Sequence, residues 1–322
     1  MRLFDKAHYD FLAVRKTAYV ITALLAATGL TFLAVRGVNE SIEFTGGTEI
    51  QLQTNQPDIN TGTLRSALNA SGIRGAEIQT FGAPNEFIIR AQVAMAGTDT
   101  VSTQQAQAVV DSALTHKLGK DAYTIEGVYA VSPRVGSELR TKAVTAVLLS
   151  FGATLIYLWF RFEWRFAVGA ILATVHDIIG TVAFISMLHL EISLVVVAAV
   201  LTIVGYSLND TIIVFDRVRE NLRKYKRQNL YEVLNLSVNE TLPRTVLTAG
   251  TTLVATLALL IFGGEVIRGF AWVMTFGIAT GTFSSIYIAS PVFLWIERRW
   301  PGEDARGARA LPSPAAATPE AG

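Results

Sequence analysis

Residues 192–215 read ISLVVVAAVLTIVGYSLNDTIIVF. This stretch is longer than the roughly 20 largely apolar residues that a helix needs to cross a membrane. The strongly polar pair Asn209-Asp210 interrupts it close to one end. Ionisable side chains within a span are expensive and are functional candidates by default. The stretch therefore predicts a membrane-spanning helix and marks Asp210 as a candidate functional residue.

Five other apolar stretches have the length of a span, which makes six predicted spans in the chain. They cover residues 17–35, 141–160, 166–188, 245–262 and 270–296. The composition agrees, because 51% of the 322 residues are hydrophobic and 16% are charged, whereas soluble proteins average about 25% charged residues. The first stretch is longer than the roughly 7–15 apolar residues of a secretory signal, so we expect a retained anchor rather than a cleaved signal peptide.

Charge and cysteine content exclude other classes of protein. The net charge is +1 and the chain contains no cysteine. No strongly basic face points to nucleic acid, and the absence of cysteine excludes disulfides, a thiolate nucleophile and cysteine-ligated metal. Hydrolase signatures such as Gly-x-Ser-x-Gly, a P-loop or His-Glu-x-x-His are also missing, so we do not expect an enzyme.

The distribution of Lys and Arg predicts the orientation in the membrane, because cytoplasmic segments carry an excess of both. Basic residues flank one end of the spans, at Arg15-Lys16, Arg161 and Arg165, within 217–227, and at Arg298-Arg299. We therefore expect residues 1–16, the basic loop 216–244 and the tail 297–322 to be cytoplasmic, and we expect the tail, rich in Pro and Ala, to be largely disordered. The basic run could instead bind lipid or nucleic acid.

This orientation places residues 36–140 outside the cytoplasm as a small α+β domain. The predicted order is strand, helix, strand, strand, helix, strand, which is the ferredoxin-like pattern. The expected elements are a strand at 48–53, a helix at 63–70, a hairpin of 76–81 and 86–90, a helix at 102–118 and a strand at 123–131. The fold class predicted for the whole chain is an α-helical integral membrane protein with one ferredoxin-like domain between its first two spans.

Glycine and proline flank this outer domain on both sides. Gly46-Gly47 precedes its first strand, and Pro133 and Gly136 follow its last strand. Such residues punctuate ordinary turns. The alternative is that they form two hinges on which the domain moves relative to the membrane.

Two sites within the predicted spans carry ionisable groups. Asp210 lies near the cytoplasmic end of its span, beside Asn209, and Arg244 opens the next span on the same side, so the two charges can meet across a helix interface. Desolvation and a nearby Arg act on a carboxyl in opposite directions, so its protonation can change when the Arg moves, as a proton relay requires. The alternative is a static ion pair that locks two helices. His176-Asp177 lie in the middle of another span, and relay and packing roles are both open for them; no metal-site spacing accompanies His176.

Several motifs are specific enough to indicate a family. The longest is VGYSLNDTIIVFDRVREN at 204–221. Supporting matches are FTGG at 44–47, PRVG at 133–136, His176-Asp177, PRTVLTAGTT at 243–252 and FGG at 262–264. Taken in this order, they resemble the SecF family of the bacterial SecDF complex, within the RND superfamily. Glu43 stands where the family usually has Asp, and Ser132 stands where a Gly is common.

The resemblance implies a half-transporter in the bacterial cytoplasmic (inner) membrane that pairs with SecD and uses the proton-motive force to assist Sec-dependent export. It places the family's proton-carrying Asp at Asp210 and its essential Arg at Arg244. It implies SecYEG, YajC, the emerging polypeptide and, indirectly, SecA as partners. No cofactor is implied; the coupling ion is H⁺, with Na⁺ left open. The alternatives are half of an RND-type small-molecule exporter and a non-transporting scaffold of the translocon.

Overall fold

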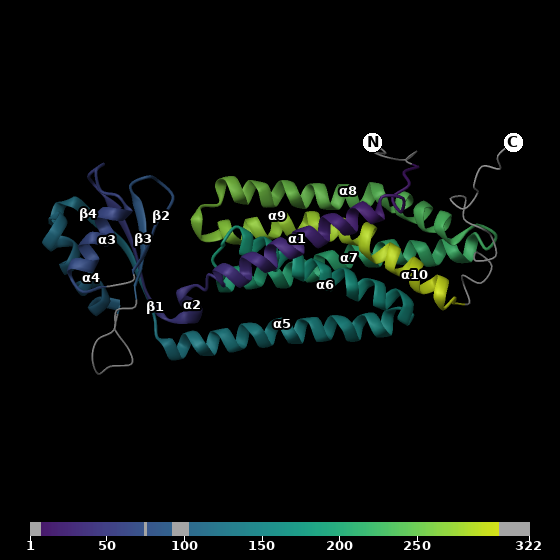
Figure 1. Cartoon of the computed structure of the whole chain (residues 1–322), viewed down its shortest axis with the longest axis horizontal. Coiled ribbons are helices and arrows are strands. Elements are labelled where there is room, and N and C mark those ends of the chain that lie inside the picture. The colour runs from purple at the N-terminus through teal and green to yellow at the C-terminus, as the bar shows by residue number, and fades with distance from the viewer. Residues whose placement is uncertain (1–7, 74–75, 92–102, 303–322) are drawn as a thin grey trace.

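The computed structural model describes residues 8–73, 76–91 and 103–302, and it consists of a bundle of long helices with a sheet domain at one end (Figure 1). The long helices are α1 (Arg15–Arg36), α5 (Pro133–Arg161), α6 (Trp164–Met187), α7 (Leu194–Lys224), α8 (Leu230–Phe262) and α9 (Glu265–Ser284). The last continues through a π-helical turn (Ser285–Ala289) into α10 (Ser290–Arg299). Six segments of the described chain are long and apolar enough to cross a membrane, which confirms the predicted class.

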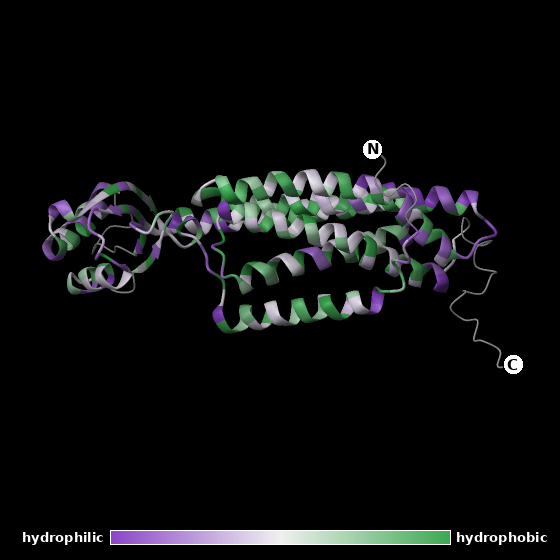
Figure 2. Cartoon of the chain, turned by 90° about the horizontal axis from the view of Figure 1, so that it is seen from above, coloured by the Kyte–Doolittle hydropathy of each residue, from purple (hydrophilic) through white to green (hydrophobic). Residues whose placement is uncertain are grey.

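The distribution of apolar and polar residues along the bundle is that of a membrane-embedded protein. Figure 2 shows hydrophobic residues along the middle of the long helices and hydrophilic residues concentrated at both ends. Helices α6, α7 and α9 are the most buried, whereas α1, α5 and α8 expose most of their apolar surface. In Figure 1 α5 runs along one side, apart from the other helices. The chain therefore leaves large apolar helix faces for lipid or for another membrane protein.

An aromatic cluster holds three helices together near the end that carries the chain termini. The rings of Phe166 (α6) and Phe293 (α10) stack at 4.2 Å between centroids, and Phe215 (α7) meets Phe166 edge-on at 5.3 Å. All three side chains are buried. Stacked and edge-on pairs add stability beyond the apolar area they bury.

The sheet domain has the predicted ferredoxin-like order. Its elements are β1 (Gly47–Thr54), α3 (Thr61–Ala70), β2 (Glu77–Thr80), β3 (Glu86–Ala91), α4 (Thr103–Leu118), a short 3-10 turn (Lys120–Ala122) and β4 (Tyr123–Val131), preceded by the short helix α2 (Ile42–Thr45). The strands lie in the order β2-β3-β1-β4 with every neighbouring pair antiparallel, and Ile50 of β1 faces Ile89 and Val128. Alternation along β1 buries Ile50 and Leu52 against the helices.

One polar contact fastens α4 to the last strand of this domain. The hydroxyl of Tyr123 donates to the Asp111 carboxylate at 2.6 Å and lies 2.8 Å from the hydroxyl of Thr115. Burial and the bond to Asp111 raise the pKa of Tyr123 to about 12, so the phenol stays protonated and remains a donor at physiological pH.

The prediction that residues 216–244 form a loop is wrong, because most of these residues are helical. Helix α7 continues to Lys224 and α8 begins at Leu230, so residues 225–229 alone form the turn. Pro243 lies inside α8, and Arg244 therefore does not open a helix. The extension is stable because apolar residues recur on its inner side. Val218, Leu222, Val233, Leu234 and Val238 are buried there.

Two further boundaries differ from the prediction. Helix α5 begins at Pro133, eight positions before the predicted span at 141–160, because the Ser132 hydroxyl caps it by accepting from the Val135 amide at 3.4 Å. Helix α10 carries the chain to Arg299, past the predicted start of a disordered tail. The tail from residue 303 onwards and residues 1–7 lie outside the described residues.

Candidate functional site

Asp177 joins three helices inside the bundle. Its side chain lies on α6 with the residue 1% exposed. One carboxylate oxygen accepts a hydrogen bond from the Ser284 hydroxyl of α9 at 2.7 Å and another from the Ser207 hydroxyl of α7. The other oxygen lies 3.0 Å from Nδ1 of His176. Asp177 thus has partners on both α7 and α9, which favours a packing role over a relay role.

Two glycines on α9 make these contacts geometrically feasible. A Cβ on Gly281 would lie 2.8 Å from Cβ of Ser207, and a Cβ on Gly277 would lie 2.2 Å from Cδ1 of Ile203. The two glycines are four residues apart and therefore lie on one helix face. Small residues at such spacing allow helices in membranes to approach closely. The closeness of α7 and α9 brings Ser207 and Ser284 to the same carboxylate.

Asp210 lies on the same helix as Ser207, and its carboxylate has fewer hydrogen-bond partners among the described residues than the Asp177 carboxylate has. The residue is 1% exposed. In the described part of the chain its carboxylate accepts a single hydrogen bond, from the Thr282 hydroxyl of α9 at 3.4 Å. A buried carboxylate with one long hydrogen bond is weakly held, because charged groups are stable in the interior only when paired and hydrogen-bonded. Asp210 is therefore better suited than Asp177 to gaining and losing a proton.

The direct Asp210–Arg244 ion pair expected from sequence is not formed in this conformation. Arg244 lies on the exposed side of α8 and makes no ion pair among the described residues. Its charge nevertheless lies close enough to act electrostatically on the Asp210 carboxylate. Asn209 is exposed on the outer face of α7 and does not join the Asp210 contacts, because consecutive helix residues point about 100° apart.

The roles of the hydroxyl groups around these carboxylates were not predicted from sequence. Ser284 and Ser285 stand at the junction of α9 with the π-helical turn, where Ser285 also lies 2.8 Å from the Thr211 hydroxyl of α7. Single π-helical turns inside α-helices are frequent at functional sites. Within the described ranges, no group of three or more His, Cys, Asp or Glu is arranged to hold a metal ion.

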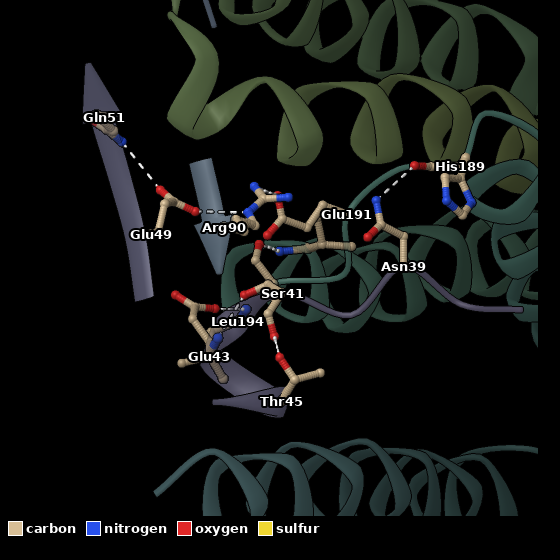
Figure 3. A network of polar contacts seen from close by, with 12 residues as sticks. Asn39, Ser41, Glu43, Thr45, Glu49, Gln51, Arg90, His189, Glu191 and Leu194 are labelled. Carbon is tan, nitrogen blue, oxygen red and sulfur yellow. Dashed lines mark hydrogen bonds and ion pairs between the residues drawn. The ribbon is translucent and has the colours of Figure 1, made fainter. Parts of the chain in front are cut away.

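The four predicted hinge residues meet at one place, between the sheet domain and the bundle. Gly46 and Gly47 have φ of +73° and +135°. A Cβ on Gly46 would lie 2.7 Å from Cα of Pro133, and one on Gly136 would lie 2.8 Å from the Phe44 carbonyl oxygen. The end of α2 therefore packs directly on the start of α5. We call residues 39–47, 132–136 and 188–194 the neck; part of its polar network is drawn in Figure 3.

Gly46→Ala is expected to destabilise the neck strongly. Alanine would be strained at a positive φ and would also collide with Pro133, so we expect a loss of about 1–3 kcal/mol beyond the backbone strain alone. Gly37→Ala is the matched control, because Gly37 has a φ of +70° with nothing within 4 Å of an added Cβ. Thermal unfolding of the two purified variants checks this; equal melting temperatures would contradict the close packing.

The comparisons with known proteins agree on one family. The family model described as the C-terminal part of protein export membrane protein SecD/SecF matches residues 110–299, and the SecD/SecF GG motif model matches residues 31–58. The protein translocase subunit SecF of Gemmatimonas aurantiaca is 51% identical over 99% of this chain and 96% of its own length. The chain belongs to the SecF family. The SecF of Desulfurispirillum indicum is 39% identical over 91% of this chain and 93% of its own.

Solved SecDF structures have the same fold. The crystal structure of SecDF from Thermus thermophilus matches 93% of this SecF-family chain at 38% identity, with a TM-score of 0.81. The chain spans 40% of the length of that protein. A second structure, SecDF in the super-membrane-facing form, matches at 39% identity but with a TM-score of 0.65. Because the identities are nearly equal, the lower score reflects a difference in shape between the two structures.

Proposed function

We propose that this SecF-family chain forms one half of a SecDF unit that uses the proton-motive force to assist protein export across the bacterial cytoplasmic membrane. The observation that carries the proposal is the state of Asp210, which is buried in a spanning helix. Among the described residues its carboxylate accepts one long hydrogen bond, and the nearby Arg244 makes no ion pair. Asp177, one helix away, has polar contacts with Ser207, Ser284 and His176. This contrast supports Asp210, rather than Asp177, as the proposed group that exchanges the proton.

Protonation changes the forces between α7 and its neighbours. The charged carboxylate attracts Arg244, and the neutral acid does not, so each state favours a different arrangement of α7 and α8. One elementary charge that crosses the membrane potential supplies about 2.3 kcal/mol per 100 mV. That is enough to bias an element whose two conformations differ by a few kcal/mol. The resulting movement would act on the sheet domain, which with SecD would hold the emerging polypeptide and hinder its return.

Orientation and partners are part of the same proposal. Basic residues gather at the end of the bundle that carries both termini, and the sheet domain lies at the opposite end (Figure 1). By the positive-inside rule, this distribution supports a cytoplasmic location for both termini. The solved structures that share this fold are of SecDF, and this chain spans 40% of the length of one of them. SecD is therefore the proposed partner in the membrane, and SecYEG, YajC and SecA are proposed partners of the assembled unit.

The surface of α7 supports a partner in the membrane. Ala198, Thr202, Gly205 and Asn209 are all exposed and lie along one face of the helix. A polar amide such as Asn209 is unfavourable against lipid and commonly bonds across a helix interface. We place a SecD helix on this face.

Deletion of the chain separates export from the exporter alternative. We expect secretory precursors to accumulate in the deletion strain and susceptibility to small toxic molecules to stay within twofold of the parent. Restoration of export by the wild-type chain is the control for effects of the deletion on neighbouring genes. Normal precursor processing together with increased drug susceptibility would contradict the proposal.

A further inference from the structure

We propose that Arg90 and Glu191, together with Glu43, transmit movement of helix α7 to the sheet domain. This inference rests on the proposed function, because it names the route by which a change at Asp210 reaches the outer domain. The three residues come from different parts of the fold. Arg90 lies on β3, Glu191 lies in the connection between α6 and α7, and Glu43 lies on α2 (Figure 3).

The first link is an ion-pair chain centred on Arg90. Its Nε lies 3.0 Å from the Glu49 carboxylate of β1, and its Nη2 contacts the Glu191 carboxylate. Glu49 fixes the guanidinium on the sheet, and Glu191 attaches it to the bundle. The side chains of Arg90, Glu49 and Glu191 are 12%, 15% and 28% exposed. Such partly buried pairs are screened less by salt than surface pairs are.

The second link lies at the first residue of α7. The Leu194 amide donates to the Glu43 carboxylate at 2.6 Å. This amide is one of the unsatisfied donors at a helix start, and the helix dipole favours a negative charge there. Glu43 therefore ties the end of α7 to α2, which leads directly into β1 through Gly46. The Ser193 hydroxyl caps the same helix from its own chain, by accepting from the Val196 amide.

The third link runs through the backbone. The Ser41 amide donates to the Ile192 carbonyl at 3.0 Å, and the Ile192 amide donates to the Asn39 carbonyl at 2.7 Å. Asn39 also donates from its side chain to the His189 carbonyl at 3.3 Å. The connection between α6 and α7 is thus paired like a short parallel bridge with the segment that leads into the sheet domain.

These links matter for Asp210 because it shares α7 with Leu194. The two positions are sixteen residues apart along an uninterrupted helix, about 24 Å at 1.5 Å per residue. A helix transmits displacement along its axis far better than a loop does, so a shift of α7 at Asp210 displaces the carboxylates bound at its other end. Because spatial intermediacy alone is not coupling, proton flow and export have to be measured separately.

The experiment uses the full chain assembled with its SecD partner in membrane vesicles with an imposed proton gradient. Glu191→Gln and Arg90→Gln are each expected to lower the stimulation of export by the gradient about tenfold, within the range typical of coupling between sites. Proton permeation through the complex, export without a gradient and complex yield should stay within twofold of wild type. Glu126→Gln is the control, because Glu126 is an exposed carboxylate on β4 of the same domain. The double variant should be no worse than either single variant, since the two residues act as one unit.

Two results would overturn the inference. One is full stimulation of export in Glu191→Gln and Arg90→Gln; the other is a loss of stimulation that only follows a loss of assembled complex. Asp210→Asn, measured in the same vesicles, separates this failure from failure of the proposed function. If the gradient still stimulates export in Glu191→Gln but not in Asp210→Asn, only the proposed coupling route is contradicted. If the gradient still stimulates export in both variants, the proton relay is contradicted as well.

Discussion

Asp210→Asn is expected to abolish the stimulation of export by the proton-motive force while the complex remains assembled. The amide has nearly the same shape as the acid and can keep the hydrogen bond from Thr282, but it cannot take up or release a proton. We therefore expect export to fall to the level seen without a gradient. Pulse labelling of a secreted protein, with the precursor followed over time, measures the effect in cells.

Asp216→Asn is the matched control on the same helix. Asp216 is paired with Arg161 at 2.7 Å, and its side chain is 43% exposed. Exposed ion pairs contribute little, typically about 0–1 kcal/mol, so this variant should export like wild type. Normal gradient-dependent export by an assembled Asp210→Asn complex would contradict the relay.

Asp177→Ala is expected to weaken the bundle itself. The change removes the acceptor shared by Ser207 and Ser284 and leaves a small cavity where α6, α7 and α9 meet. Hydrogen bonds to charged groups contribute about 1.5–3 kcal/mol each, so we expect a loss of about 3 kcal/mol in the stability of the purified complex. Thermal unfolding in detergent, together with the yield of assembled complex, measures this loss.

Asp177→Asn distinguishes a structural role of Asp177, which holds three helices together, from a role as a second proton carrier. The amide keeps an acceptor oxygen for the two serine hydroxyls, so its stability should lie between that of wild type and that of Asp177→Ala. Export per assembled complex should remain gradient-dependent. An assembled Asp177→Asn complex that has lost gradient-dependent export would place Asp177 in the proton path beside Asp210.

The sheet domain was predictable from sequence because its signals are local. Ile50 and Leu52 alternate with polar residues in β1, and Pro84-Asn85 mark the hairpin between β2 and β3. The apolar lengths of the six spans were equally readable, since crossing a membrane demands a minimum length. The ends of the helices were harder, because charged residues can continue a helix into water, as α7 does up to Lys224.

The tertiary contacts of the site could not be read from a single sequence. Nothing local indicates that Ser207 and Ser284, far apart in the chain, converge on Asp177, or that Gly277 and Gly281 permit it. The two residues that depart from the usual family pattern also acquire roles only in the structure. Glu43 binds the first amide of α7, and Ser132 caps α5.

Separate proton and sodium gradients imposed on vesicles that contain the complex test the central claim most directly. A proton gradient alone should stimulate export by the wild-type complex, a sodium gradient alone should not, and Asp210→Asn should respond to neither. Stimulation of the wild type by sodium alone, or an equal response of wild type and Asp210→Asn to protons, would contradict a proton relay at Asp210.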